Sequence, residues 1–217
     1  MKIEVWSDFV CPFCYIGKRR LEEAIAQTGV ANQVEVEFKS FQLDPNTPKE
    51  SNKTMYEVLA EKYGSTVDAA KTMTEQVVEQ AKTVGLDYNF DGMKPANTAD
   101  AHRLVKWAGY QGKAAEANEL LLKAYFIDGK EIGNNEVLLD LMESIGLARK
   151  EAEKVLISDM YLNEVQADIE KAGKIGVRGV PFFVLNDKYA ISGAQPTETF
   201  VGAINKIAEE SGLKPSI

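Results

Sequence analysis

The chain has 217 residues, enough for one large domain or for a small domain that carries an insertion. Its 25 Lys and Arg residues against 33 Asp and Glu give a formal net charge of -8. This charge argues against nucleic acid as the main partner, because phosphate binding requires clustered positive charge. No stretch approaches the ~18 apolar residues of a membrane span, and residues 1–8 show no secretory signal. We therefore expect a cytoplasmic protein with no membrane partner.

The first third of the chain predicts a strand, a helix and a second strand. Residues 2–7 alternate in polarity, as a strand does. Pro12 suits the first turn of a helix, where no N–H donor is needed, and apolar residues recur at helical spacing up to Gly29. Apolar residues alternate with glutamates within residues 33–43, which predicts the second strand. The basic cluster at residues 18–20 is expected on a solvated face of the helix.

From about residue 54 to about residue 173 the periodicity is helical. Helices are expected to begin near Thr54, Ser65, Asn97, Lys113, Asn134, Arg149 and Ser158. The segments that open at Ser65 and Asn97 resemble capping boxes in which Asp68 and Asp100 take the third place. Strand character is weak throughout this block.

The end of the chain predicts a hairpin and a helix. Residues 181–185 and 188–191 have strand character around the turn signal Asn186-Asp187, and a helix is expected from Pro196 to about Glu210, followed by a tail at residues 214–217. Without the helical block, the order is β-α-β followed by β-β-α, which is the order of the thioredoxin core. The block is too long for a crossover loop. We therefore predict an α/β thioredoxin fold, residues 1–50 and 174–217, with an inserted all-helical domain, residues 51–173.

Two cysteines, the only ones in the chain, are separated by Pro12 and Phe13 between the first strand and the first helix. A lone C-x-x-C in this setting is typical of dithiol–disulfide chemistry, since one helical turn returns the second sulfur to the first. We expect Cys11 at the helix N-terminus, where free N–H groups favour a thiolate, and predict that it is the attacking cysteine. Cys14 is expected to resolve the mixed disulfide. The Asp8 carboxylate would oppose the thiolate if it points toward the sulfur.

A Val-Pro pair precedes the predicted hairpin. In the thioredoxin fold the strand after the last long helix starts with a cis-proline that faces the C-x-x-C, so we expect a cis bond before Pro181. Val180 would offer its backbone to an extended substrate by strand addition.

Four blocks of this sequence resemble, in the same order, those of the DsbA-like, FrnE-type oxidoreductases. The blocks are residues 7–18, 41–43, 97–103 and 176–183, and the likeness covers nearly the whole chain. The resemblance implies a thioredoxin fold with a helical insertion and protein dithiol–disulfide oxidoreductase activity. It also implies that Cys11 is the nucleophile, Cys14 the resolving cysteine and Pro181 the cis-proline.

The resemblance also suggests substrate-binding residues, and this chain differs from many family members at one position. Pro12, Phe13, Val180, Asn97 and His102 are the predicted substrate-binding residues, although spacing alone favours a structural role for His102 near a helix start. Many FrnE-type members carry tryptophan where this chain has Phe13. Because Phe13 provides neither a donor nor a cation, we expect a reactive motif without the most oxidising potential. Known members of this chemistry lie between roughly -270 and -120 mV.

Other functions remain as alternatives. A tetrahedral zinc site needs four ligands, and only His102 remains beside the cysteines, so no metal is expected. The wider family includes 2-hydroxychromene-2-carboxylate isomerases and kappa-class glutathione transferases, which use serine at the position of Cys11 and bind glutathione. A glutathione-dependent transferase or isomerase is therefore the second hypothesis, with glutathione open as a co-substrate beside protein or peptide disulfides. A helical interaction module on an inactive redox scaffold is the third. A monomer and a homodimer are both compatible with the sequence.

Overall fold

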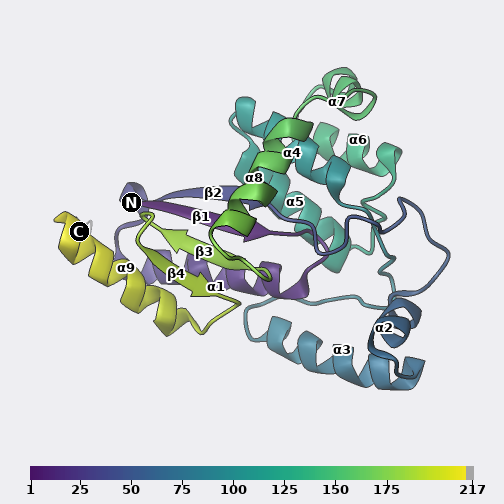
Figure 1. Ribbon diagram of the computed structural model, residues 1–217, viewed down its shortest axis with the longest axis horizontal. Coiled ribbons are helices and arrows are strands. Elements are labelled where there is room, and N and C mark those ends of the chain that lie inside the picture. Colours follow the sequence, from purple (N-terminus) through teal and green to yellow (C-terminus); the bar gives the residue numbers. More distant parts are fainter. Residues whose placement is uncertain (214–217) are drawn as a thin grey trace.

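The computed structural model describes residues 1–213, so the tail predicted at residues 214–217 lies outside it. In the described chain, the strands form a mixed sheet in the order β2-β1-β3-β4 (Figure 1). The strands are β1 (Lys2–Ser7), β2 (Glu35–Ser40), β3 (Phe182–Leu185) and β4 (Tyr189–Ser192). The central strand β1 pairs in parallel with β2 and antiparallel with β3. Residues 186–188 join β3 to β4, with positive φ angles at Asn186 and Asp187. The predicted hairpin is confirmed, but its turn is one residue longer than the predicted Asn186-Asp187 pair because the second strand begins at Tyr189.

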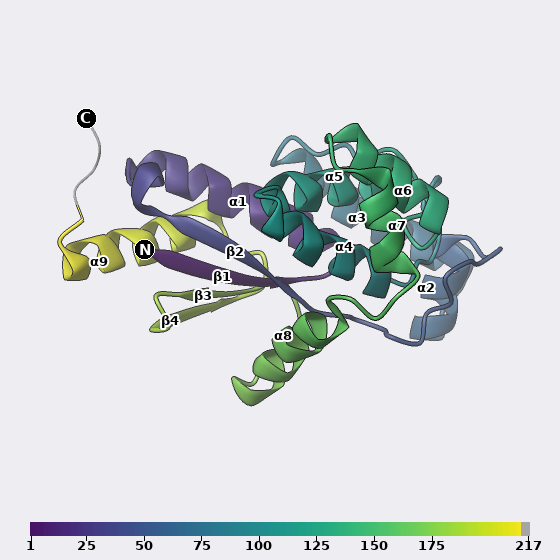
Figure 2. The same cartoon turned by 90° about the horizontal axis from the view of Figure 1, so that it is seen from above.

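Helices cover both faces of this sheet. Helices α1 (Pro12–Thr28) and α9 (Thr197–Ser211) lie on one face, and α8 (Leu162–Lys174) lies on the other (Figure 2). Alternation along β1 accounts for this arrangement, because successive side chains of a strand point to opposite faces. Ile3 and Val5 pack against the α1 and α9 side, whereas Trp6 packs against α8.

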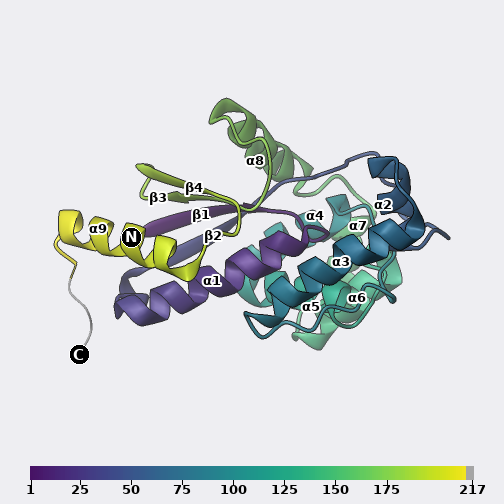
Figure 3. The same ribbon diagram turned by 90° about the horizontal axis from the view of Figure 1, so that it is seen from below.

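The remaining helices follow β2 and gather at the end of the sheet where α1 begins (Figures 1 and 3). They are α2 (Met55–Tyr63), α3 (Val67–Lys82), α4 (Ala99–Tyr110), α5 (Ala114–Phe126), α6 (Asn135–Ser144) and α7 (Arg149–Leu156). Their hydrophobic core also takes in Phe9, which precedes α1, and Tyr15 and Ile16 from the start of that helix. The observed fold is the predicted one, a thioredoxin-like α/β domain with a helical insertion. No helix in residues 1–213 is long and apolar enough to cross a membrane.

The predicted domain boundaries, after residue 50 and before residue 174, stay a proposal. Helix α8 precedes the second boundary and yet contacts the sheet, since the Trp6 indole N–H donates to the Asp168 carbonyl oxygen at 2.9 Å. The Asp168 carboxylate accepts from the Ser40 backbone N–H at 2.8 Å.

The structure confirms four of the predicted helix starts, which are Thr54, Lys113, Asn134 and Arg149, and corrects the other three. Thr54 and Asn134 are N-caps whose side chains accept backbone N–H groups. The cap of α3 is Thr66 rather than Ser65. Asp100 forms no capping box with Asn97, because its carboxylate binds the side chains of Lys49 and Arg103. The last helix of the block begins at Leu162 instead of near Ser158.

The basic cluster of α1 is also different from the prediction. Lys18 is buried rather than solvated, and its ammonium group donates to the carboxylates of Glu22 and Glu119, both at 2.5 Å. The Arg19 guanidinium binds the same Glu119 carboxylate. This ion cluster fastens α1 to α5.

Candidate active site

Cys11 occupies the N-cap of α1, as predicted. Its backbone is extended, with φ -92° and ψ 111°, and Pro12 follows at the start of the helix. The first turn carries no acidic residue, so the positive end of the helix dipole is not offset there. Cys14 completes this turn, and its N–H donates to the Cys11 carbonyl oxygen at 3.0 Å. Both residues are buried free thiols.

The Val180–Pro181 segment lies against Cys11. The Val180–Pro181 peptide bond is cis, as the sequence predicted. The Cys11 thiol donates to the Val180 carbonyl oxygen at 3.4 Å. The structure therefore brings together Cys11, Val180 and Pro181 from opposite ends of the chain.

Gly17 lets α1 pack closely against Pro181 and Phe183. This residue was not identified from the sequence. A Cβ atom at this position would lie 3.0 Å from the Pro181 Cγ atom and 3.1 Å from the Phe183 Cζ atom. Glycine one turn after the C-x-x-C was the available signal, because glycine inside a helix costs about 1 kcal/mol and therefore suggests a packing role.

The two thiols differ in acidity. The pKa of Cys11 is lowered, mainly because the Cys14 thiol donates a hydrogen bond to it, whereas burial and the Asp8 charge act in the opposite direction. The pKa of Cys14 is raised well above its ordinary value, mainly by burial and further by Cys11. The Ser7 hydroxyl offsets part of that increase. Cys11 is therefore the first of the two to ionise, as a nucleophile must be.

Beneath the cysteines lies a buried polar pair. The Asp8 carboxylate is 1% exposed, and one of its oxygens lies 3.2 Å from the His102 Nε2 atom. Its other oxygen accepts from the Leu43 backbone N–H at 2.8 Å. The His102 ring packs against Phe9, with ring centroids 4.6 Å apart. The single histidine of the chain is thus connected to the C-x-x-C segment through Asp8, a contact that sequence spacing did not reveal.

The residues between the cysteines differ in exposure. Phe13 is 37% exposed, so an apolar ring beside the sulfurs is open to a partner. The Pro12 carbonyl oxygen accepts from the Tyr88 hydroxyl at 2.7 Å. Tyr88 is a second residue that the sequence reasoning missed. It is buried, and burial raises the pKa of its phenol, so Tyr88 stays a hydrogen-bond donor to the site.

Asn97 supports a loop in this structure. Its side-chain amide donates to the carbonyl oxygens of Pro45 and Thr47 at 3.1 and 2.8 Å, and its oxygen accepts from the Ala99 N–H. These contacts fix the segment that follows Leu43. The predicted substrate-binding role of Asn97 stays a prediction.

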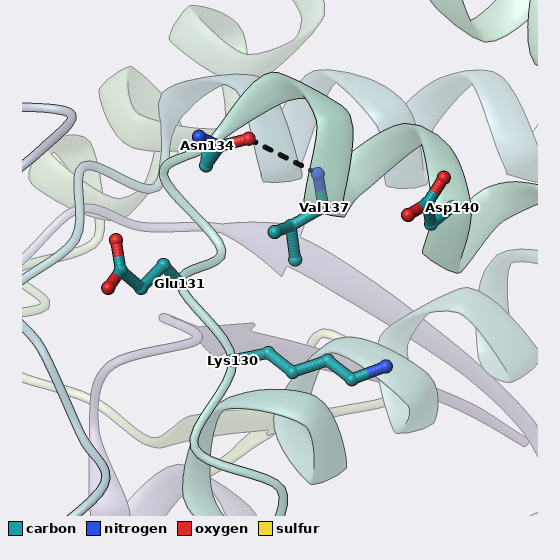
Figure 4. Close-up of a pocket in the computed structure, with 5 residues that line it drawn as sticks. All are labelled: Lys130, Glu131, Asn134, Val137 and Asp140. Carbon is teal, nitrogen blue, oxygen red and sulfur yellow. Dashed lines mark hydrogen bonds between the residues drawn. The ribbon is translucent and has the colours of Figure 1, made fainter.

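A pocket of about 370 Å³ lies elsewhere, at the start of α6. Figure 4 shows its lining residues, which are Lys130, Glu131, Asn134, Val137 and Asp140. It is open and charged, and neither cysteine lines it. Within residues 1–213, no group of three or more His, Cys, Asp or Glu side chains is placed to hold a metal ion.

The fold and the site define a thioredoxin-like protein with a C-x-x-C at the start of its first helix. The profile of the family described as "DSBA-like thioredoxin domain" matches residues 2–205. The chain therefore belongs to this family of DsbA-like thioredoxin-fold oxidoreductases.

Individual relatives agree with this assignment. The chain is similar to the crystal structure of a probable DsbA oxidoreductase from Streptomyces coelicolor, with 34% identity, a TM-score of 0.90, and coverage of 100% of this chain and 92% of that chain. It is 28% identical over 207 residues to the uncharacterized protein YwbO of Bacillus subtilis, covering 94% of this chain and 95% of the relative. A 2-hydroxychromene-2-carboxylate isomerase structure shares the fold, with 15% identity, a TM-score of 0.72, and coverage of 99% of this chain and 100% of that chain.

Proposed function

We propose that the protein is a thiol–disulfide oxidoreductase that acts on protein or small-molecule disulfides through Cys11. The observation that carries this proposal is the position of the Cys11 thiol, at the N-terminus of α1 and opposite the Val180 carbonyl. A helix N-terminus favours the thiolate, which is the attacking species in thiol–disulfide exchange. The lowered pKa of Cys11 agrees with this role.

The exchange proceeds in two displacements. The Cys11 thiolate attacks one sulfur of a substrate disulfide, forms a mixed disulfide and releases the other sulfur as a thiolate. Cys14 then loses its proton and attacks the Cys11 sulfur, which releases the second substrate thiolate. The two cysteines are oxidised to a disulfide, and the two substrate sulfurs are reduced. The same steps in reverse would oxidise a substrate dithiol.

The substrate surface in this proposal combines apolar and backbone groups. The exposed ring of Phe13 would contact an apolar part of the substrate, and Val180 would pair with its backbone. Pro12 lies in the turn between the sulfurs. Asn97, which contacts the loop after β2, and His102, which contacts Asp8, are the other predicted substrate-binding residues.

The test is the reduction of insulin disulfides by the wild-type protein and by the Cys11→Ser variant. Reduction that depends on Cys11 supports the proposal, and equal rates would overturn it. Tyr110→Ala provides a control, because Tyr110 is an exposed aromatic residue at the end of α4, away from the first turn of α1.

A glutathione-dependent isomerase or transferase is the second candidate, because the isomerase fold covers almost the whole chain. Isothermal titration with glutathione, followed by assays on a hydrophobic substrate, distinguishes the two candidates. Activity that survives Cys11→Ser would favour the second, since a hydroxyl would then suffice at this position.

A further inference from the structure

The buried Asp8 carboxylate has one basic side chain near it in the part of the chain that the structure describes. Among the residues that the structure describes, the His102 ring is the only basic side chain within ion-pair distance of it, at 3.2 Å. The nearby bases of α4 are engaged elsewhere: Arg103 binds Asp100, and Lys106 binds Asp168. Both members of the pair are almost inaccessible, with 1% of Asp8 and 4% of His102 exposed.

Burial at this depth makes a bare charge on Asp8 costly. An isolated ionised carboxylate inside a protein costs several kcal/mol, and it is compensated by a paired cation or avoided by protonation. The Leu43 N–H that binds Asp8 favours the ionised carboxylate. Within residues 1–213, only the His102 ring is placed to supply a balancing positive charge.

This pair lies next to the reactive sulfur. The Asp8 carbonyl oxygen accepts from the Cys11 N–H at 3.2 Å, so a single turn joins the two residues. The negative charge of Asp8 acts to raise the pKa of Cys11. The titratable groups that face Asp8 are Cys11 and Cys14 from α1, His102 from α4 and Tyr125 from α5.

We propose that His102 is a positioning residue for the redox site, where in its protonated form it neutralises Asp8 and thereby preserves the Cys11 thiolate. This inference rests on the proposed function, because it concerns the ionisation of the nucleophile assigned there. In this role His102 acts through Asp8 and transfers no electrons. Its loss leaves Asp8 as an unbalanced negative charge beside the sulfur.

The experiment measures the pKa of Cys11 from the ultraviolet absorbance of the thiolate against pH. Each variant is made in the Cys14→Ala background so that a single thiol titrates. His102→Gln should raise the pKa of Cys11 by about one unit, which is roughly a tenfold smaller thiolate fraction near neutral pH. Adding Asp8→Asn to His102→Gln removes the unbalanced charge and should return the pKa of Cys11 close to its starting value. An unchanged pKa in His102→Gln, or an increase that persists in the double variant, would overturn the proposal.

Asp100→Asn is the matched control. Asp100 is another buried carboxylate on α4, but it pairs with Lys49 and Arg103 instead of facing Asp8. The pKa of Cys11 should not change in this variant. A shift equal to that of His102→Gln would mean that any disturbance of α4 acts on the thiol, and the proposal would fail.

The wild-type protein provides a measurement that does not depend on the folding of a variant. His102 is the only histidine in the sequence, so a single pair of imidazole signals reports its charge in an NMR spectrum. At pH 7 the signals should lie at the imidazolium position, and neutral imidazole signals would overturn the proposal. These readouts follow ionisation rather than turnover. Insulin reduction that is insensitive to Cys11→Ser would therefore refute the proposed function without deciding the charge of this pair.

Discussion

Cys11 and Val180, separated by 169 positions in the chain, are joined by a hydrogen bond from the Cys11 thiol to the Val180 carbonyl oxygen. A thiolate has no proton to donate, so this contact belongs to the protonated form of Cys11 alone. Ionisation of the nucleophile therefore leaves the Val180 carbonyl available. We expect it then to accept a backbone N–H of an extended substrate, so that activation of the sulfur and opening of the peptide site coincide.

Replacing Cys14 by alanine should make Cys11 less acidic. The Cys14 thiol is the donor that lowers the pKa of Cys11 most, and alanine removes it. The pKa of Cys11, measured by thiolate absorbance, should rise toward the value of a free thiol. The same variant should accumulate mixed disulfides, since nothing resolves them, and mass spectrometry would detect them. A pKa of Cys11 below that of the wild type would contradict this prediction.

Gly17→Ala should destabilise the protein although alanine favours a helix. The added methyl group meets Pro181 and Phe183 within 3.0 to 3.1 Å, and overpacking of this kind costs about 1–3 kcal/mol. Gly202→Ala in α9 is the matched control, because no atom lies within 4 Å of its added methyl group. That substitution should stabilise the protein by up to about 1 kcal/mol. Urea denaturation of both variants gives the comparison, and equal effects would argue against close packing at Gly17.

Glu119→Gln should weaken the attachment of α5 to α1 in a pH-dependent way. The carboxylate is partly buried, and its hydrogen bonds with Arg19 and Lys18 overcome this burial to lower the pKa of Glu119 to about 2. Because the folded pKa lies below the unfolded one of about 4.3, the stabilisation is present above pH ~4.3 and disappears as the pH falls through ~2. At neutral pH the variant should lose about 1–2 kcal/mol in the free energy of unfolding.

The pH series of denaturation curves decides this point. Wild type and Glu119→Gln should converge near pH 2, and a constant difference would show that packing rather than charge is responsible. Glu116→Gln is the control on the same helix. Its exposed carboxylate pairs with Lys113 at 3.2 Å, so the substitution should change stability by no more than about 0.5 kcal/mol.

Asn97→Ala should release the loop that follows β2. The side chain holds the carbonyl oxygens of Pro45 and Thr47, and their loss should cost about 1–3 kcal/mol. Limited proteolysis within residues 41–53 should become faster, whereas the pKa of Cys11 should stay the same. Asn46→Ala, at an exposed position of the same loop, is the control. A higher KM without a loss of stability would instead support direct substrate binding by Asn97.

Local chemistry explains which elements were predictable. Pro12 begins α1 and Gly29 ends it, and Thr54 caps α2. These helix ends depend on the conformational preferences of residues within a few positions, which the sequence displays directly. Ser65 is not the N-cap of α3 because the neighbouring Thr66 has a similar hydroxyl and accepts the Ala69 N–H instead. The predicted thioredoxin fold placed Pro181 opposite Cys11, and the resemblance to a known family agreed with that placement.

Long-range partners account for what was missed. Lys18 is buried because Glu119, 101 positions later, provides a counter-charge for it. Asp8 and His102 are 94 positions apart, and no periodicity relates them. From the sequence alone, a charged residue is predicted to be exposed to solvent, because its partner of opposite charge is not known. The partner depends on how the helices pack, which a single sequence does not specify.

The division of α1 between two hydrophobic cores has a consequence for evolution and engineering. Tyr15 and Ile16 pack among the inserted helices, whereas Leu21 and Ala24 pack beneath the sheet. Removal of the inserted helices would expose the apolar side chains of the first turns of α1. The segment that carries both cysteines would then lose its packing contacts. A chimera that exchanges the inserted helices between relatives must therefore transplant the beginning of α1 along with them.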